Sequence, residues 1–113
     1  SRYLCDVERV HGLPKGIRQK SLRRGSRSDI VYEGYGVIVE LDGQRGHVGM
    51  GQRNDGWRDA RNLIAGWVTL RFTWADVVQH SCDVAATVAQ LLAARGWQGS
   101  PHRCAVCSQA QSI

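Results

Sequence analysis

Three acids and one histidine are spaced so that they could form a site for acid–base or metal-assisted chemistry. Asp29 precedes one apolar run, and Glu40 and Asp42 end the next, GVIVELDG. His47 follows shortly afterwards in a glycine-rich segment. Carboxylates at the end of a buried strand are costly unless a cation or a hydrogen-bond donor pairs with them. This leaves three interpretations open: a metal site, a salt-bridged turn, or acids with no particular role.

A shared cation requires the two apolar runs to form a hairpin. Antiparallel pairing would then place Asp29 beside Glu40, while Glu40 and Asp42 face the same side of an extended strand. Mg²⁺ or Mn²⁺ prefers oxygen ligands and keeps several waters, so Asp29, Glu40 and the main-chain carbonyl of Leu41 would suffice as ligands. We expect His47 to exchange a proton with the reacting oxygens.

A basic segment lies directly before the first of these acids. It carries six positive charges and no negative one, which is typical of either a solvated loop or a phosphate-contacting surface. The whole chain has a net charge of +5 at pH 7, an excess compatible with a polyanionic partner. The six cationic residues are Lys15, Arg18, Lys20, Arg23, Arg24 and Arg27.

The elements that would position these residues follow from the apolar spacing. Helices are predicted over 3–11, from 55 to the glycine at 66, from 74, and over 83–95; strands are predicted over 16–21, 30–32, 37–41 and 67–72. A helix between the last two strands permits them to be parallel neighbours. We therefore predict an α/β domain with a small mixed sheet flanked by helices. In the helix from residue 55, the residues of one apolar face are Trp57, Ala60, Leu63 and Ile64.

The 113 residues of the chain are enough for one hydrophobic core and not for two. We expect a domain over 1–97 and a polar, flexible tail over 98–113. No apolar stretch approaches the roughly 20 residues of a membrane helix, and the N-terminus lacks a signal peptide. We therefore expect a cytoplasmic location and no membrane partner. Because the chain begins with Ser1, it could be the C-terminal part of a longer protein.

The four cysteines offer a weaker metal-binding pattern. Cys104 and Cys107, with His102 just before them, form half of a zinc-binding pattern, but no second ligand pair stands at a matching distance. Cys5 and Cys82 are single and lie in expected helical segments, where free cysteine usually acts as a small core residue. We therefore expect a loose cysteine-bearing tail. Structural zinc at His102, Cys104 and Cys107 is the less favoured interpretation.

Two longer stretches carry a family resemblance. SDIVYEGYGVIVELDGQRGH and RNDGWRDARNLIAGWVTLRFTWADV resemble the Vsr-like endonuclease domains of the PD-(D/E)XK nuclease superfamily, and more narrowly the actinobacterial members of bacterial domain-of-unknown-function family 559. The resemblance spans residues 3–97. The residues that match the family pattern are Asp29, Glu40, Asp42, Gly43, His47, Asp55, Arg58, Asp59, Arg61, Asn62, Leu70, Arg71 and Phe72.

This resemblance implies a restriction-endonuclease-like core in which Asp29 and Glu40 bind the metal. The superfamily's motif lysine would fall at Asp42, so His47 is the expected replacement. Either Arg58 or Asp59 would face the site and hold the scissile phosphate or the histidine, and the pattern does not choose between them. The candidate catalytic residues are therefore Asp29, Glu40, Asp42, His47, Arg58 and Asp59.

The expected function is that of a Mg²⁺-dependent DNA endonuclease whose basic segment contacts DNA phosphates. The alternative is a catalytically weak or inactive nucleic-acid-binding or effector module, of a toxin–antitoxin or phage-defence system, that keeps the nuclease fold. The missing lysine favours this alternative. The third and least favoured hypothesis is a small interaction domain that uses zinc.

Overall fold

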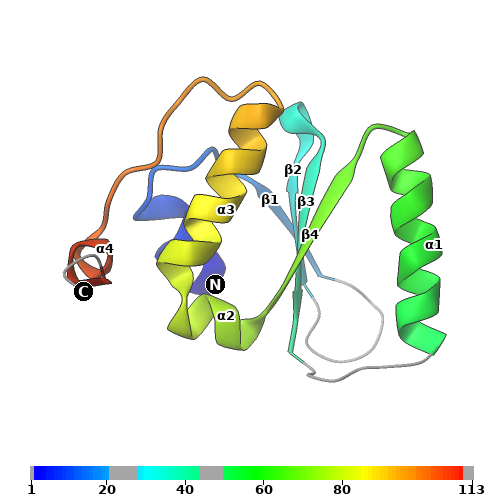
Figure 1. Ribbon diagram of the computed structural model, residues 1–113, viewed down its shortest axis with the longest axis horizontal. Coiled ribbons are helices and arrows are strands. Elements are labelled where there is room, and N and C mark those ends of the chain that lie inside the picture. The colour runs from blue at the N-terminus through cyan, green and yellow to red at the C-terminus, as the bar shows by residue number, and fades with distance from the viewer. Residues whose placement is uncertain (1, 21–27, 44–49, 111–113) are drawn as a thin grey trace. The chain divides into compact units, whose positions relative to one another are not determined.

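A computed structural model describes residues 2–20, 28–43 and 50–110 of the chain (Figure 1). The chain divides into two compact units. The sheet unit is Gly16–Thr73, and the helical unit combines Ser1–Lys15 with Trp74–Ile113. This division falls within the segment 1–97 that the sequence assigned to one domain.

The sheet unit is built on four strands in the order β1-β2-β3-β4. Strands β1, β2 and β3 pair antiparallel, and β4 pairs parallel to β3, so the predicted mixed α/β architecture is confirmed. Helix α1 (Met50–Ile64) connects β3 to β4 and lies on one face of the sheet (Figure 1). The restriction-endonuclease-like core remains a prediction. The strands are β1 (Ile17–Lys20), β2 (Ser28–Tyr32), β3 (Val37–Asp42) and β4 (Val68–Thr73).

A tight turn between β2 and β3 sets the pairing of these strands. It consists of the short helix η2 (Glu33–Tyr35) and Gly36, whose φ of 67° lies in the left-handed region that glycine adopts at low cost. The carbonyl of Gly36 also accepts a hydrogen bond of 2.9 Å from the N–H of Val68 at the start of β4. The turn therefore helps to set the register of both β2 and β4 against β3.

Strand β3 alternates between two kinds of surroundings. Val37, Val39 and Leu41 have no exposed surface, whereas Ile38 and Asp42 on the other side are half-buried. Glu40 shares that second side but is only 4% exposed. A carboxylate is thus buried on the sheet face that α1 covers.

Helix α1 turns a polar face toward the sheet. Arg58 and Asp59 are half-buried, whereas Trp57, Leu63 and Ile64 are 66%, 61% and 89% exposed. The apolar face predicted from the amphipathic pattern is therefore not the buried face of this helix. The physical reason is that Arg58 and Asp59 find charged partners on β3 and β4, and these partners offset the cost of burying them.

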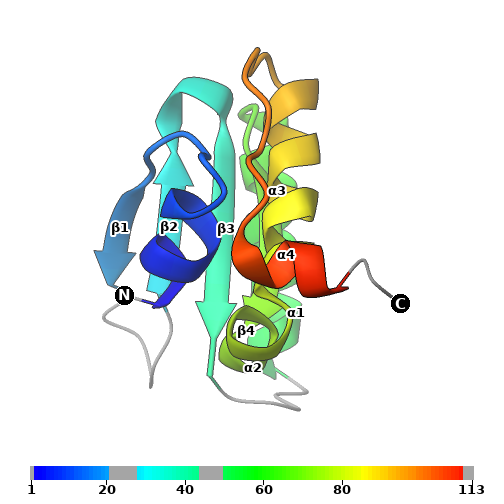
Figure 2. The same ribbon diagram turned by 90° about the vertical axis from the view of Figure 1, so that its left-hand side faces the viewer.

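The helical unit comprises four helices among the described residues, and α3 supplies more of its buried apolar side chains than any other helix. Its buried side chains, spaced by three or four residues, are Val84, Ala85, Val88, Ala89 and Leu92. Helix η1 packs against α3 (Figure 2). It has hydrogen bonds of the π type, and its residues Tyr3 and Val7 are fully buried. The last helix forms in the segment that the sequence assigned to a tail. The four helices are η1 (Tyr3–Arg9), α2 (Trp74–Gln79), α3 (Ser81–Ala94) and α4 (Ala105–Ala110).

The helices of the described ranges are all too short or too polar to cross a lipid bilayer.

Candidate functional site

Asp29 and Glu40 lie directly opposite each other in the pairing of β2 with β3. Residues at opposite positions of an antiparallel pair share a face of the sheet and have Cβ atoms about 5 Å apart. Asp29 is half-buried and Glu40 is buried. The structure thus brings the two predicted acids together on the face that carries α1.

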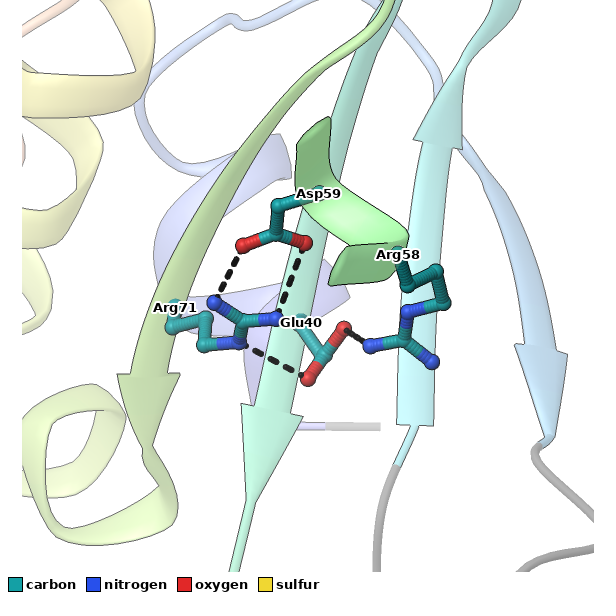
Figure 3. A network of polar contacts seen from close by, with 4 residues as sticks. All are labelled: Glu40, Arg58, Asp59 and Arg71. Carbon is teal, nitrogen blue, oxygen red and sulfur yellow. Dashed lines mark hydrogen bonds and ion pairs between the residues drawn. The ribbon is translucent and has the colours of Figure 1, made fainter. Parts of the chain in front are cut away.

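Both carboxylate oxygens of Glu40 accept hydrogen bonds from arginine (Figure 3). Arg58 on α1 donates through Nη2 to Oε2 over 2.7 Å, and Arg71 on β4 donates through Nε to Oε1 over 3.2 Å. Because Glu40 is 4% exposed, these ion pairs offset the cost of removing its charge from water.

Asp59 completes the network by holding the far side of Arg71 (Figure 3). Nη2 of Arg71 donates to Oδ1 of Asp59 over 2.9 Å, and Nη1 donates to Oδ2, so the pair is bidentate. Burial acts to lower the pKa of Arg71, but the hydrogen bonds and charges of Asp59 and Glu40 outweigh burial and raise it above its ordinary value. The guanidinium therefore keeps its charge. We name these four residues, Glu40, Arg58, Asp59 and Arg71, the arginine–acid network.

The predicted Mg²⁺ or Mn²⁺ site at Asp29, Glu40 and Leu41 is wrong. Glu40 directs both of its oxygens to guanidinium groups rather than to a shared cation position. Among the described residues, the group of three or more His, Cys, Asp or Glu side chains that could hold a metal ion is a different one, in the helical unit. Its sulfur and imidazole ligands suit a softer ion than Mg²⁺.

Asp42 is among the described residues, whereas several other predicted site residues are not. Asp42 is half-buried at the end of β3, in register with Thr73. His47 lies outside the described residues, and so do the predicted nucleic-acid-binding residues Arg23, Arg24 and Arg27.

The remaining basic residues lie on or next to β1, the edge strand beside β2. Lys15 is exposed just before the strand, and Lys20 ends it. Arg18 is exposed and in register with Ile30. Since Asp29 is the neighbour of Ile30 along β2, Arg18 leaves the sheet on the face opposite to the acid pair. Arg18 and the two acids therefore do not converge.

The metal-ligand group in the helical unit consists of His11, Cys82, Cys104 and Cys107, which we name the Cys₃His cluster. Its four candidate ligand atoms all lie within 4.8 Å of one another. Cys82 Sγ is 3.5 Å from Cys104 Sγ, which is 3.6 Å from Cys107 Sγ. Cys107 Sγ is 3.3 Å from Nε2 of His11. The expectation that the C-terminal cysteines form a loose tail without zinc is therefore wrong.

The histidine of this cluster is His11 and not the predicted His102. The two residues are adjacent because the backbone N–H of His102 donates to the carbonyl of His11 over 2.6 Å. The His102 ring packs against Gly12, where a Cβ atom would lie 2.7 Å from its Nδ1. Gly12 also has a φ of 68°. A glycine is therefore needed there both for its conformation and for its lack of a side chain.

The His11 ring is oriented by its second nitrogen. Nδ1 lies 2.8 Å from the carbonyl oxygen of Val7. Since a carbonyl can only accept, this hydrogen bond requires the proton on Nδ1 and leaves the lone pair of Nε2 directed at the sulfurs. The side chain is buried, with His11 only 2% exposed, so the ring is fixed in this orientation.

The thiols of the cluster differ in acidity. Burial raises the pKa of Cys82 to about 12, and hydrogen bonds and charge from Cys107 and Cys104 add to that effect. Burial acts in the same direction on Cys104, but backbone hydrogen bonds from Cys107 and Val106, with thiol hydrogen bonds from Cys82 and Cys107, outweigh it and lower its pKa to about 6. Cys104 therefore ionises at a lower pH than Cys82.

None of the protein-family models, curated proteins or solved structures compared with this chain matches it. The resemblance to Vsr-like endonuclease domains therefore rests on the motifs of the sequence alone.

Proposed function

We propose that the sheet unit is an endonuclease domain that binds DNA and hydrolyses its phosphodiester bonds. The observation that carries this proposal is the direct opposition of Asp29 and Glu40 on β2 and β3, with Arg58 and Arg71 held at Glu40. Two acids and two arginines at one place on a sheet supply the groups that a phosphodiester reaction uses.

The two arginines are the phosphate-binding groups of this proposal. The side chains of Arg58 and Arg71 are 27% and 39% exposed, so a phosphate can reach both guanidinium groups from solvent. Arginine binds phosphate oxygens through parallel N–H donors. Because negative charge builds up on these oxygens as water attacks, guanidinium groups fixed beforehand by Glu40 and Asp59 stabilise the transition state.

The acids supply the proton acceptor for the attacking water. Asp29 and Glu40 lie opposite each other on paired strands, and in this proposal one of them accepts the proton. Substitution by the matching amide distinguishes them, because an amide keeps the shape of the side chain but cannot take up the proton.

Cleavage of supercoiled plasmid tests the proposal. The unaltered chain should convert supercoiled plasmid to nicked or linear DNA. At least one of the variants Asp29→Asn and Glu40→Gln should abolish this conversion. The assay is run on the protein as purified and with a series of added divalent cations, so that any cation requirement is itself a result. Asp83→Asn is the matched control, since its side chain is 89% exposed in the helical unit. Cleavage that persists in both Asp29→Asn and Glu40→Gln would overturn the proposal.

A second candidate is a nucleic-acid-binding or effector module without cleavage activity, of the toxin–antitoxin or phage-defence kind. The closed hydrogen bonding of the arginine–acid network favours it, because both oxygens of Glu40 already have partners. Gel-shift titrations at several salt concentrations measure binding independently of cleavage. Retarded DNA or RNA without cleavage in the same buffers would select this second candidate.

A further inference from the structure

We propose that the helical unit binds one structural Zn²⁺ ion through His11 Nε2 and the thiolates of Cys82, Cys104 and Cys107. The site involves residues of the helical unit only and uses none of the groups assigned to phosphodiester hydrolysis. It therefore stands or falls independently of the endonuclease proposal.

The spacing of the four atoms fits a tetrahedral ion. Zinc–sulfur distances of about 2.3 Å and zinc–nitrogen distances of about 2.0 Å separate tetrahedral ligand atoms by about 3.5–3.8 Å. The neighbouring atoms of the cluster lie 3.5, 3.6 and 3.3 Å apart. Modest adjustment of the side chains would bring all four to an ion at their centre.

A disulfide explains the cluster less well than zinc does. All four cysteines of the chain are free thiols, and the sulfur–sulfur separations of 3.5 and 3.6 Å exceed the bonded distance of about 2.05 Å. Any one disulfide within the cluster would use two of its three sulfurs and leave the third beside the His11 nitrogen. A single four-coordinate Zn²⁺ ion accounts for all four groups at once.

The outer contact of His11 adds a second, independent argument. Histidines that bind zinc usually donate their other ring N–H to a carbonyl or carboxylate. Nδ1 of His11 makes that contact with the carbonyl of Val7 over 2.8 Å, and the residue is 2% exposed. The ring is thus held in the orientation that a ligand requires before any ion binds.

The ligand set indicates a structural role. Four protein ligands leave no open position for water or substrate, which is the arrangement of structural rather than catalytic zinc. The ligands come from the turn after η1, from α3, and from the residues at the start of α4. Because His11 and Cys107 are 96 positions apart in the chain, the ion would join segments that the sequence separates widely and would stabilise the folded helical unit.

Metal analysis of the full chain, purified in a reducing buffer without chelator, tests the proposal. We expect about one zinc per chain in the unaltered protein and loss of this zinc in Cys104→Ser and Cys107→Ser. The matched control is Cys5→Ser, because Cys5 is exposed and lies outside the cluster. For the histidine, His11→Ala should weaken zinc retention during dialysis against a chelator, whereas His102→Ala should retain zinc like the unaltered chain.

Cobalt titration of the zinc-stripped, unaltered chain keeps the test independent of whether variants fold. Co²⁺ bound tetrahedrally by three thiolates and one imidazole gives intense visible d–d bands and a sulfur-to-metal charge-transfer band, which added Zn²⁺ should abolish. Absence of these bands in a chain that is folded and reduced would overturn the proposal. So would zinc content that is unchanged in Cys104→Ser, or that falls equally in Cys5→Ser.

Discussion

Glu40 and Arg71 occupy the same register position on the parallel strands β3 and β4, and Nε of Arg71 lies 3.2 Å from Oε1 of Glu40. The acid is 4% exposed, whereas the arginine side chain is 39% exposed. The arginine therefore connects a buried carboxylate to the protein surface, where it also holds Asp59. This relationship makes the network a structural feature of the sheet as well as the candidate reaction site.

Removal of the Arg71 side chain should destabilise the sheet unit. Arg71→Ala takes a guanidinium partner from buried Glu40, and we expect the free energy of unfolding to fall by about 1–2 kcal/mol, less than for a fully buried pair because Arg71 is partly exposed. Arg71→Lys should recover only part of this loss, since lysine cannot hold Glu40 and Asp59 with one planar fork. Urea unfolding measures the change, with exposed Arg18→Ala as the control; equal losses in Arg71→Ala and Arg18→Ala would contradict the expectation.

Arg58 and Glu40 should be energetically coupled. Their side chains meet over 2.7 Å, and the single variants Arg58→Ala and Glu40→Gln should cost more in sum than the double variant costs. We expect a coupling energy of about 1 kcal/mol, within the range for residues in direct contact. Urea unfolding of the four proteins in the cycle gives this energy. Simple additivity would mean that the contact contributes nothing to the stability of the fold.

The sequence was sufficient to predict the acid pair because only local features decide it. The apolar run 37–41 and the glycine-containing turn before it indicate a hairpin, and the register that this hairpin adopts places Asp29 opposite Glu40. The sequence also marked Arg58 and Asp59 as candidates without choosing between them. Both residues belong to the arginine–acid network, since Arg58 pairs with Glu40 and Asp59 pairs with Arg71.

Features that depend on the meeting of distant segments were missed. Arg71 reaches Glu40 only through the parallel register that follows the α1 crossover. The Cys₃His cluster draws on ligands that span 96 positions, so a search for two nearby ligand pairs detects only Cys104 and Cys107. The one sequence signal for the missing histidine is its position just before Gly12, where a turn brings the chain back on itself.

The outward apolar face of α1 leads to a further prediction. Ile64 is 89% exposed, so Ile64→Lys should change the free energy of unfolding by less than about 0.5 kcal/mol. A helix packed through its apolar face would instead lose about 2 kcal/mol or more on the same change. Leu92→Ala on α3 is the contrasting control, because Leu92 has no exposed surface and should cost about 2–4 kcal/mol. Thermal or urea unfolding of both variants decides between these arrangements.

The acidity of Cys104 can be measured in the reduced, metal-free chain. A pKa lowered to about 6 means that its thiolate is present at lower pH than that of an ordinary cysteine, whereas Cys82, with its pKa raised to about 12, stays protonated throughout neutral pH. Alkylation by iodoacetamide requires the thiolate, so the labelling rate of Cys104 should rise as the pH passes about 6 and level off above it.

Peptide mass spectrometry across a pH series resolves the two sites within one sample. A short cysteine-containing peptide of ordinary thiol pKa is added to each sample as the reference, and we expect the labelling of Cys104 to level off at a lower pH than that of the peptide. Cys82 should label last, and only as the pH becomes strongly alkaline. Labelling of Cys104 that follows the same pH profile as the reference peptide would show that the hydrogen bonds at its sulfur do not stabilise the thiolate. Added Zn²⁺ should then suppress the labelling of Cys104 and leave that of Cys5 unchanged, because a metal-bound sulfur is no longer free to attack.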